Sequence, residues 1–297
     1  MLKTPFMMAH RLLMLVAIVV IVSSLGLLGL FVFRGELAEE FTSGRQPTQF
    51  FRDLDDDLLE SYGQVFGVAH NSGDSLRATR VALAHGADVI EMDVVSLGGE
   101  LYAAHLPPQP WIGARAFRGP SLAAVWALAT EADAVKLDLK ESSPRFLDLV
   151  FAFLDERRDE HQVLIATRDV ATLQAFAVRC PEVFRFLSVP TLSHFQELQQ
   201  DEDVIALIDG VTIRHTLLDE TSAGWLEDRG LLVLAWTVND LWRVNQLVLL
   251  GVDAITTDNL AILQLLGGQE RGEVILARRK SAPEPGEQPA GKEAKRR

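Results

Sequence analysis

Short runs of apolar and β-branched residues alternate with helix-like segments along most of the chain, and this alternation constrains the fold more than any other feature. Eight such runs occur, at 64–70, 88–95, 134–140, 162–168, 184–190, 210–215, 231–239 and 253–259. Several of the intervening segments end in the glycine that commonly follows a helix, as at Gly86, Gly230 and Gly251. Eight strand–helix repeats in about 200 residues predict an α/β fold, a closed (β/α)8 TIM barrel. A doubly wound open sheet is the alternative, but no glycine-rich phosphate loop opens the first helix.

The second run is followed by a double glycine, Gly98-Gly99, and by the strand-like run LYAAH. Together they predict a small β-hairpin inserted after the second barrel strand. A two-residue turn at the glycines would pair His105 with Met92, on the face of the hairpin opposite to Asp93. If His105 is to join the carboxylate of Asp93, we therefore expect a one-residue bulge or a longer loop at the double glycine.

The amino-terminal part contains an uncharged apolar run of 22 residues, 12–33. At about 1.5 Å per residue it matches a hydrocarbon core of roughly 30 Å, so it predicts one transmembrane helix. A secretory signal peptide is the alternative, but its apolar core is only about 7–15 residues long and ends near an A-x-A-like site, which is absent here. Basic residues flank the run on both sides, so the positive-inside rule discriminates weakly. We expect residues 1–11 in the cytoplasm and a single-pass protein of the cell membrane with an extracytoplasmic catalytic domain.

The remaining boundaries follow from composition. Residues 34–63 form a polar linker, and residues 64–269 form the barrel domain. From Arg278 onward no apolar residue is larger than proline or alanine, so residues 270–297 are expected to be a disordered tail.

The charge balance of the chain is acidic. It has 28 lysines and arginines against 41 aspartates and glutamates, for a formal net charge of −13. A field of this sign repels nucleic acid, so we expect no nucleic-acid partner. It is compatible with a site that concentrates a divalent cation.

Carboxylates gather at the ends of two neighbouring strand-like runs. Glu91 and Asp93 are two residues apart, so their side chains point to the same face of a strand. Two inward-facing carboxylates need a cation to neutralise them, and hard oxygen ligands suit Mg²⁺ or Ca²⁺. Asp138, near the end of the next run, is the expected third metal ligand. Its alternative role is an ion pair with Lys136 or Lys140, and the alternative for the first two is a solvated strand edge.

Two histidines also follow strand-like runs. His70 ends the first run, and His105 ends the expected hairpin. Flanking a phosphate, one could take a proton from the attacking hydroxyl or water while the other gives a proton to the leaving alcohol. Each role is worth about 10²–10⁴ in rate. A lone histidine at a strand end is more often structural, so this interpretation depends on the two lying together.

The stretch VAHNSGDSLRATRVALAHGADVIEMDVVSLGGELYAAH resembles the glycerophosphodiester phosphodiesterase family. That family has a His-Arg start, a G-A-D-x-I-E-x-D-V core and a histidine that closes a hairpin. The segments KLDLK, AWTVN and GVDAITTDN are similar to its later strands, so the likeness covers roughly 64–267. It implies a (β/α)8 barrel, one divalent metal, and cleavage of glycerophosphodiesters to glycerol 3-phosphate and an alcohol. It further implies an acid/base pair of His70 and His105, metal ligation by Glu91 and Asp93, and charge stabilisation by Lys140.

Three positions depart from the family pattern. Asn71 stands where the family has an arginine, Asp138 replaces a glutamate, and Leu106 stands where an aspartate normally follows the second histidine. Asn71 and a short following loop also resemble phospholipase D and sphingomyelinase D barrels, which would make a lysophospholipid the substrate. A barrel that binds phosphodiesters without cleaving them is the remaining alternative.

Candidates for binding the phosphate and the alcohol come from the other runs. With Asn71 in place of arginine, Arg168 or Arg214 could supply the missing guanidinium, because arginine suits two-point contact with phosphate. Trp236 could border the pocket and hold a glycerol or choline group. Asp258 precedes the last helix, where an N-cap is its simplest role.

Overall fold

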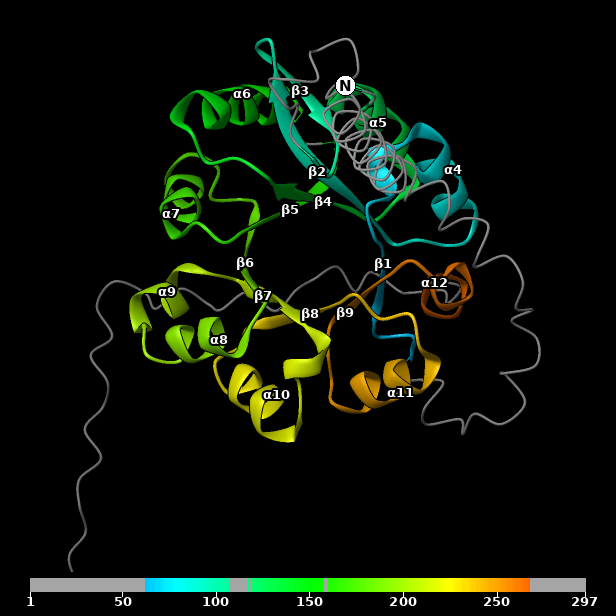
Figure 1. Cartoon of the computed structure of the whole chain (residues 1–297), viewed down its shortest axis with the longest axis vertical. Coiled ribbons are helices and arrows are strands. Elements are labelled where there is room, and N and C mark those ends of the chain that lie inside the picture. Colours follow the sequence, from blue (N-terminus) through cyan, green and yellow to red (C-terminus); the bar gives the residue numbers. More distant parts are fainter. Residues whose placement is uncertain (1–61, 107–116, 118, 158–159, 268–297) are drawn as a thin grey trace, which may run out of the picture.

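The structure is a computed structural model that describes residues 62–106, 117, 119–157 and 160–267. Eight parallel strands form a closed barrel, because β1 pairs with β2 on one side and with β9 on the other. The helices surround these strands (Figure 1). The barrel strands are β1 (Phe66–Ala69), β2 (Val89–Leu97), β4 (Ala134–Leu139), β5 (Gln162–Thr167), β6 (Phe184–Val189), β7 (Gly210–Arg214), β8 (Leu232–Trp236) and β9 (Ala254–Thr257). Each lies within one of the eight runs, so the (β/α)8 prediction is confirmed.

The helices begin at residues whose side chains can cap them. Before seven of the helices α4 to α11, a serine, threonine or aspartate side chain accepts a hydrogen bond from the backbone three residues later, as Ser75 does before α4 and Asp169 before α7. Asp240 does the same for the eighth helix, α11. The helices are α4 (Leu76–Ala84), α5 (Leu122–Leu128), α6 (Pro144–Asp155), α7 (Val170–Arg179), α8 (Leu192–Leu198), α9 (Glu202–Leu207), α10 (Glu220–Glu227), α11 (Leu241–Leu249) and α12 (Leu260–Gly267).

Alternation along the strands decides which side chains enter the barrel. Val89 belongs to the apolar cluster inside the barrel, whereas Ile90 and Met92 belong to a cluster that packs under the helices. Glu91 therefore faces inward with Val89, and Asp93 follows it. In β4 Ala134 lies in the inner cluster, and Lys136 and Asp138 follow at the same spacing. The charged side chains thus stand directly above the apolar floor of the barrel.

The floor itself is closely packed. It contains large side chains such as Phe184 and Phe186 beside Leu232. A Cβ at Gly210 would lie 2.4 Å from Leu232 O and 2.5 Å from Phe186 Cε1, so glycine is required for the strands to approach here. These closely packed side chains fill the interior of the barrel.

The inserted hairpin is present, but its register corrects the expectation. Strand β3 (Glu100–Ala103) is antiparallel to β2, and Leu97 pairs with Glu100 across a two-residue turn at Gly98-Gly99, where both φ angles are positive. The pairing continues without a bulge to Val94 and Ala103, so the predicted bulge or longer loop is wrong. β3 ends before His105, and the chain bends there. The ladder register consequently no longer dictates which way His105 points.

The predicted segments at the two ends lie largely outside the described residues. These are the cytoplasmic segment 1–11, the transmembrane helix 12–33, most of the linker 34–63, and the tail 270–297. Within the described ranges no helix is long and apolar enough to cross a bilayer. Tyr62, at the end of the linker, is buried in the core against Val65 and its neighbours.

Candidate active site

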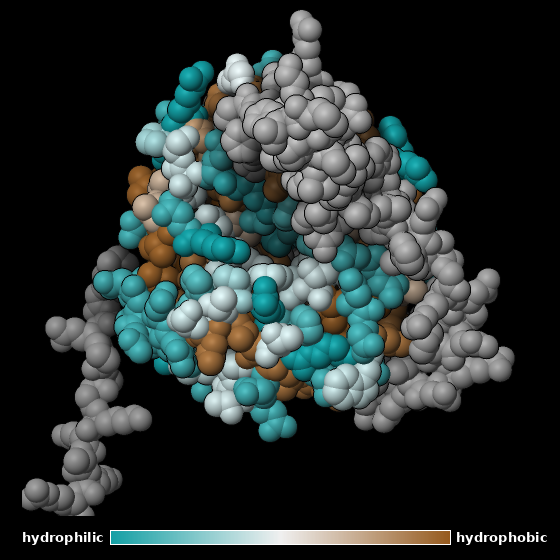
Figure 2. Space-filling model, in the orientation of Figure 1, coloured by the Kyte–Doolittle hydropathy of each residue, from teal (hydrophilic) through white to brown (hydrophobic). Residues whose placement is uncertain are grey.

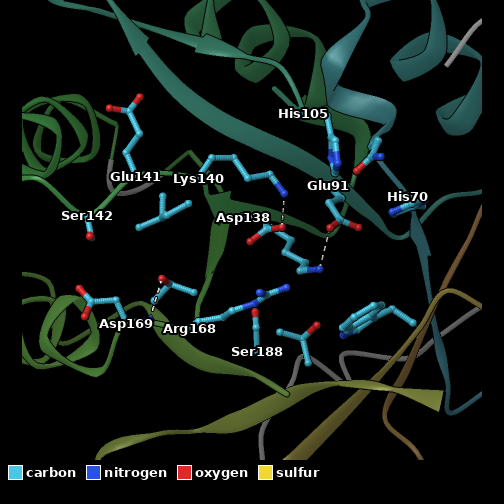
Figure 3. A pocket seen from close by; sticks show the side chains of 16 residues that line it. His70, Glu91, His105, Asp138, Lys140, Glu141, Ser142, Arg168, Asp169 and Ser188 are labelled. Carbon is cyan, nitrogen blue, oxygen red and sulfur yellow. Dashed lines mark hydrogen bonds and ion pairs between the residues drawn. The ribbon is translucent and has the colours of Figure 1, made fainter. Parts of the chain in front are cut away.

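A cavity of about 460 Å³ opens at the carboxyl ends of the barrel strands, where the active sites of such barrels lie. Hydrophilic residues line a hollow near the middle of the face seen in Figure 2. The lining side chains converge on this space from several strands (Figure 3). Eight of the ten residues selected from the sequence line the cavity, namely His70, Asn71, Glu91, His105, Asp138, Lys140, Arg168 and Trp236.

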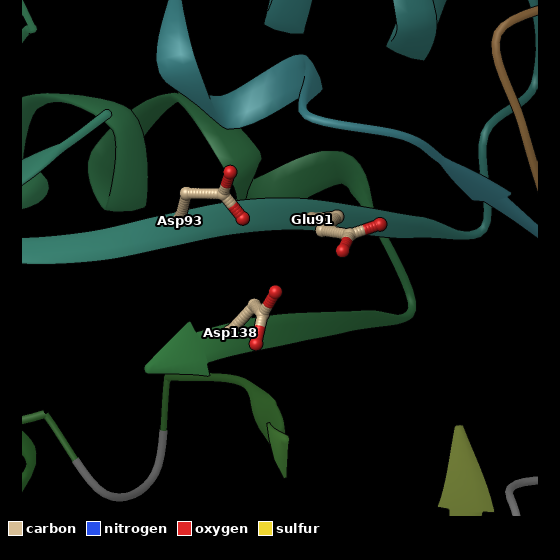
Figure 4. Close-up of side chains that lie close together, drawn as sticks. All are labelled: Glu91, Asp93 and Asp138. Atoms are coloured by element: carbon tan, nitrogen blue, oxygen red, sulfur yellow. The ribbon is translucent and has the colours of Figure 1, made fainter. Parts of the chain in front are cut away.

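The three carboxylates expected to bind metal lie together (Figure 4). Asp93 and Asp138 are register partners on the neighbouring strands β2 and β4, and Glu91 lies one inward-facing position earlier on β2. One oxygen from each comes within 4.8 Å of the others. Glu91 and Asp93 are buried, whereas Asp138 is partly exposed. The arrangement is a compact cluster of hard oxygen ligands, and two of its members, Glu91 and Asp138, line the cavity.

Two lysines neutralise part of this negative charge. Lys136 Nζ donates to Glu91 Oε1 at 2.8 Å, and both side chains are buried. Removing one partner of a buried pair typically costs about 3–5 kcal/mol, because the other charge stays behind uncompensated. Lys140 Nζ lies 2.6 Å from Asp138 Oδ2 and 2.9 Å from Asp93 Oδ1. Burial alone would lower the pKa of Lys140, but the charges of Asp93 and Asp138 outweigh burial and hold its pKa above the ordinary value.

The cluster still has room for a cation. Glu91 Oε2 is buried without a hydrogen-bond partner among the described residues. A buried carboxylate oxygen left in this state is costly. Three carboxylates also outnumber the two ammonium groups that contact them. The donor set therefore fits one Mg²⁺ or Ca²⁺ ion.

His70 is held by the carboxylate of Asp258, the residue that directly follows β9. Its Nδ1 lies 2.7 Å from Asp258 Oδ1. Burial alone would lower the pKa of His70, but the hydrogen bond to Asp258 and the charge of Glu91 outweigh it, so the pKa is raised. The N-cap role expected for Asp258 is wrong, because Asn259 holds that position and its Oδ1 accepts from Ala261 N. The sequence missed this pair because the two residues meet only when β1 closes against β9.

His105 lies at the other side of the carboxylate cluster. Its Nδ1 is 2.6 Å from Asp93 Oδ2, and its side chain is 57% exposed, so the ring has access to the cavity. The neighbouring backbone is anchored, because Ala104 N donates to Asp93 O at 2.7 Å. The hairpin thus carries His105 to the carboxylates even though the ladder register alone would turn it away.

Asp74 also supports the cluster and was not selected from the sequence. It lies in the short 3-10 helix η2 (Ser72–Asp74), and its Oδ1 accepts from Asp93 N at 3.1 Å. Burial, and next the charge of Asp93, raise the pKa of Asp74 well above its ordinary value. A Cβ at Gly73 would lie 2.8 Å from Glu91 O, so glycine allows η2 to pack on β2. In a sequence, an aspartate at such a place looks like an ordinary turn residue.

The two candidate arginines are placed differently. Arg168 follows β5 and lines the cavity, and its side chain is labelled in Figure 3. Arg214 is exposed, does not line the cavity, and has its guanidinium carbon 5.7 Å from the centre of the Trp236 ring. Trp236 lines the cavity. Of the two candidate arginines, only Arg168 is therefore part of the cavity lining.

A parallel eight-stranded barrel with carboxylates and histidines at the carboxyl ends of its strands has the architecture of a barrel enzyme. Among solved structures, a Silicibacter pomeroyi DSS-3 protein assigned as a glycerophosphoryl diester phosphodiesterase is similar at 18% identity with a TM-score of 0.58, covering 70% of this chain and 96% of that one. An Oleispira antarctica phosphodiesterase, solved in complex with the product sn-glycerol-3-phosphate, is 19% identical with a TM-score of 0.56, covering 70% and 99%.

A glycerophosphodiester phosphodiesterase from Parabacteroides distasonis ATCC 8503 is 18% identical with a TM-score of 0.55, covering 69% of this chain and 98% of that one. No protein-family model and no curated protein matches the sequence. The resemblance inferred from the sequence is thereby confirmed at the level of the fold, over nearly the whole length of these relatives.

Replacing Asp258 by asparagine should lower the pKa of His70, because the change removes a negative charge and leaves the effect of burial. NMR titration of the His70 ring in both proteins measures the shift. Asp201→Asn, which alters a helix cap at α9 instead, is the matched control and should leave His70 unchanged. An equal pKa of His70 in Asp258→Asn and the parent protein would contradict the assigned pairing.

Proposed function

We propose that the chain is a metal-dependent phosphodiester hydrolase that cleaves glycerophosphodiesters to glycerol 3-phosphate and an alcohol. The observation that carries the proposal is the placement of two carboxylate-held histidines, His70 and His105, beside a three-carboxylate cluster in one cavity. The fold shared with solved glycerophosphodiester phosphodiesterases supports it. The product bound in the Oleispira antarctica protein supports a small glycerol phosphate ester as the ligand.

The histidines carry the proton transfers in this proposal. Asp258 holds Nδ1 of His70, and Asp93 holds Nδ1 of His105. In each ring the bonded Nδ1 fixes the orientation and leaves Nε2 to exchange a proton with the substrate. One histidine accepts the proton of the attacking hydroxyl or water, and the other protonates the leaving alcohol. The raised pKa of His70 keeps its protonated form available closer to neutral pH.

Glu91, Asp93 and Asp138 would hold the divalent cation. When bound, it supplies positive charge at the phosphoryl oxygens and so stabilises the charge that develops there. Lys140 adds a fixed ammonium beside the same carboxylates, as the family resemblance implies. Arg168 orients the phosphate from the β5 side, and Asn71 and Trp236 border the space left for the alcohol.

The location of this activity is part of the proposal. The uncharged run 12–33 supports a single transmembrane anchor, with the barrel on the extracytoplasmic side of a cell membrane. A bilayer would bring the cavity near lipid-derived phosphodiesters. Lysophospholipid cleavage by a phospholipase D-like reaction is the alternative that the assay below separates.

Full-length protein in detergent, with Mg²⁺ or Ca²⁺, should release glycerol 3-phosphate from glycerophosphocholine. His70→Ala and His105→Ala should each reduce kcat by about 10²–10⁴, because each removes one proton-transfer group. His85→Ala, at the end of α4 and outside the cavity, should retain activity. Choline release from lysophosphatidylcholine alone would favour the lipid-directed alternative. If neither substrate is cleaved and circular dichroism shows that the protein is folded, both hydrolase hypotheses are refuted. The remaining hypothesis is then a barrel that binds phosphodiesters without cleaving them.

Arg168→Met should raise KM for glycerophosphocholine more than it lowers kcat, because it removes a charged contact to the phosphate. A hydrogen bond to a charged group contributes about 1.5–3 kcal/mol, which corresponds to roughly a 10- to 150-fold change in KM. Arg214→Met removes the same charge from outside the cavity and serves as the matched control in the same steady-state assay. Similar KM changes in both variants would refute the phosphate role of Arg168.

A further inference from the structure

Lys136 is a buried cation that the proposed catalysis does not use. It is the register partner of Glu91 on the adjacent strand, so both side chains enter the barrel at the same level. Its Nζ lies 2.8 Å from Glu91 Oε1, and its side chain is 3% exposed. The pair lines the cavity above the apolar floor, and both side chains are almost fully buried. Glu91 Oε1 is therefore held by an ammonium group.

The other carboxylates of the cluster are engaged in the same way. His105 Nδ1 contacts Asp93 Oδ2, and Lys140 Nζ contacts Asp138 Oδ2. Lys140 Nζ also lies 2.9 Å from Asp93 Oδ1, so Asp93 has a nitrogen near each of its oxygens, whereas Glu91 and Asp138 each have a nitrogen at one oxygen. For Glu91 the second oxygen, Oε2, is buried and has no hydrogen-bond partner within the described part of the chain. A cation in the cluster would therefore meet Glu91 through Oε2.

We propose that Lys136 restricts Glu91 to a single ligand oxygen and thereby makes the metal site selective for Mg²⁺ over Ca²⁺. The inference rests on the metal-dependent function proposed above and specifies which ion it uses. Mg²⁺ takes six ligands in a tight octahedron and keeps several waters, so single oxygens from a few carboxylates suit it. Ca²⁺ takes six to eight oxygens and commonly uses both oxygens of a carboxylate. An ammonium on Oε1 removes that two-oxygen mode at Glu91.

The charge of Lys136 acts in the same direction. A fixed positive charge within a few ångströms weakens the binding of any divalent cation, and a buried site screens this repulsion little. Ca²⁺, the larger ion, depends more than Mg²⁺ on additional carboxylate oxygens to offset this loss of binding free energy. Removing Lys136 should therefore favour Ca²⁺ more than Mg²⁺.

Calorimetric titration of metal-free, full-length protein in detergent with Mg²⁺ and with Ca²⁺ tests this inference. The parent protein should bind Mg²⁺ at least about tenfold more tightly than Ca²⁺. Lys136→Met should lower the ratio of Mg²⁺ affinity to Ca²⁺ affinity by about tenfold. Arg179→Met, which removes one exposed positive charge at the end of α7, is the matched control and should keep the parent ratio.

Two results would overturn the inference. One is a parent protein that binds Ca²⁺ as tightly as Mg²⁺, a result that needs no variant to fold. The other is a folded Lys136→Met protein with the parent ratio. Hydrolysis of glycerophosphocholine, assayed in parallel, separates this inference from the proposed function. Turnover without ion selectivity defeats the inference alone, whereas selective Mg²⁺ binding without turnover supports it and defeats the proposed activity.

Discussion

Charge neutralisation between β2 and β4 is the interaction on which the rest of the site depends. The two strands run parallel with Glu91 opposite Lys136 and Asp93 opposite Asp138, so four charged side chains enter the barrel at neighbouring levels. Buried charges persist only when they are paired or bind a cation. The lysines meet part of this requirement, and the surplus carboxylate charge makes a cation site. Asp258 orients the ring of His70, and Asp93 orients the ring of His105.

Support for this cluster comes from short, closely fitted segments. Asp74 holds the backbone of Asp93 from η2, and Gly73 allows that helix to touch β2. The two-residue turn at Gly98-Gly99 returns the chain along β2 and delivers His105 just beyond the end of β3. These elements do not take part in chemistry. They fix the distance between the carboxylates and the second histidine.

Much of this arrangement could be predicted from the sequence, since strand periodicity is local. The two-residue spacing of Glu91 and Asp93 was enough to place both inside the barrel, and the eight runs were enough to close it. Contacts between distant strands could not be predicted in this way. Asp258 contacts His70 where β1 pairs with β9. Lys136 pairs with Glu91 and not with Asp138, because Glu91 is its register partner on β2. The position of His105 depended on where β3 ends, which alternation does not encode.

Asn71 and Asp138, which depart from the pattern of the similar family, both line the cavity. Arg168 lines the cavity just after β5, whereas Asn71 lines it after β1. Asp138 has a shorter side chain than glutamate, yet it reaches the cluster from its place opposite Asp93. The carboxylates and histidines lie around one centre despite these departures.

A crystal structure of the protein grown with Mn²⁺ and glycerol 3-phosphate would test the central claim most directly, because Mn²⁺ prefers the same oxygen ligands as Mg²⁺ and is located by its anomalous scattering. The account predicts a single strong peak coordinated by Glu91 Oε2, Asp93 and Asp138, with the phosphate beside it between His70 and His105. A peak elsewhere in the molecule, or a phosphate bound away from these histidines, would contradict it.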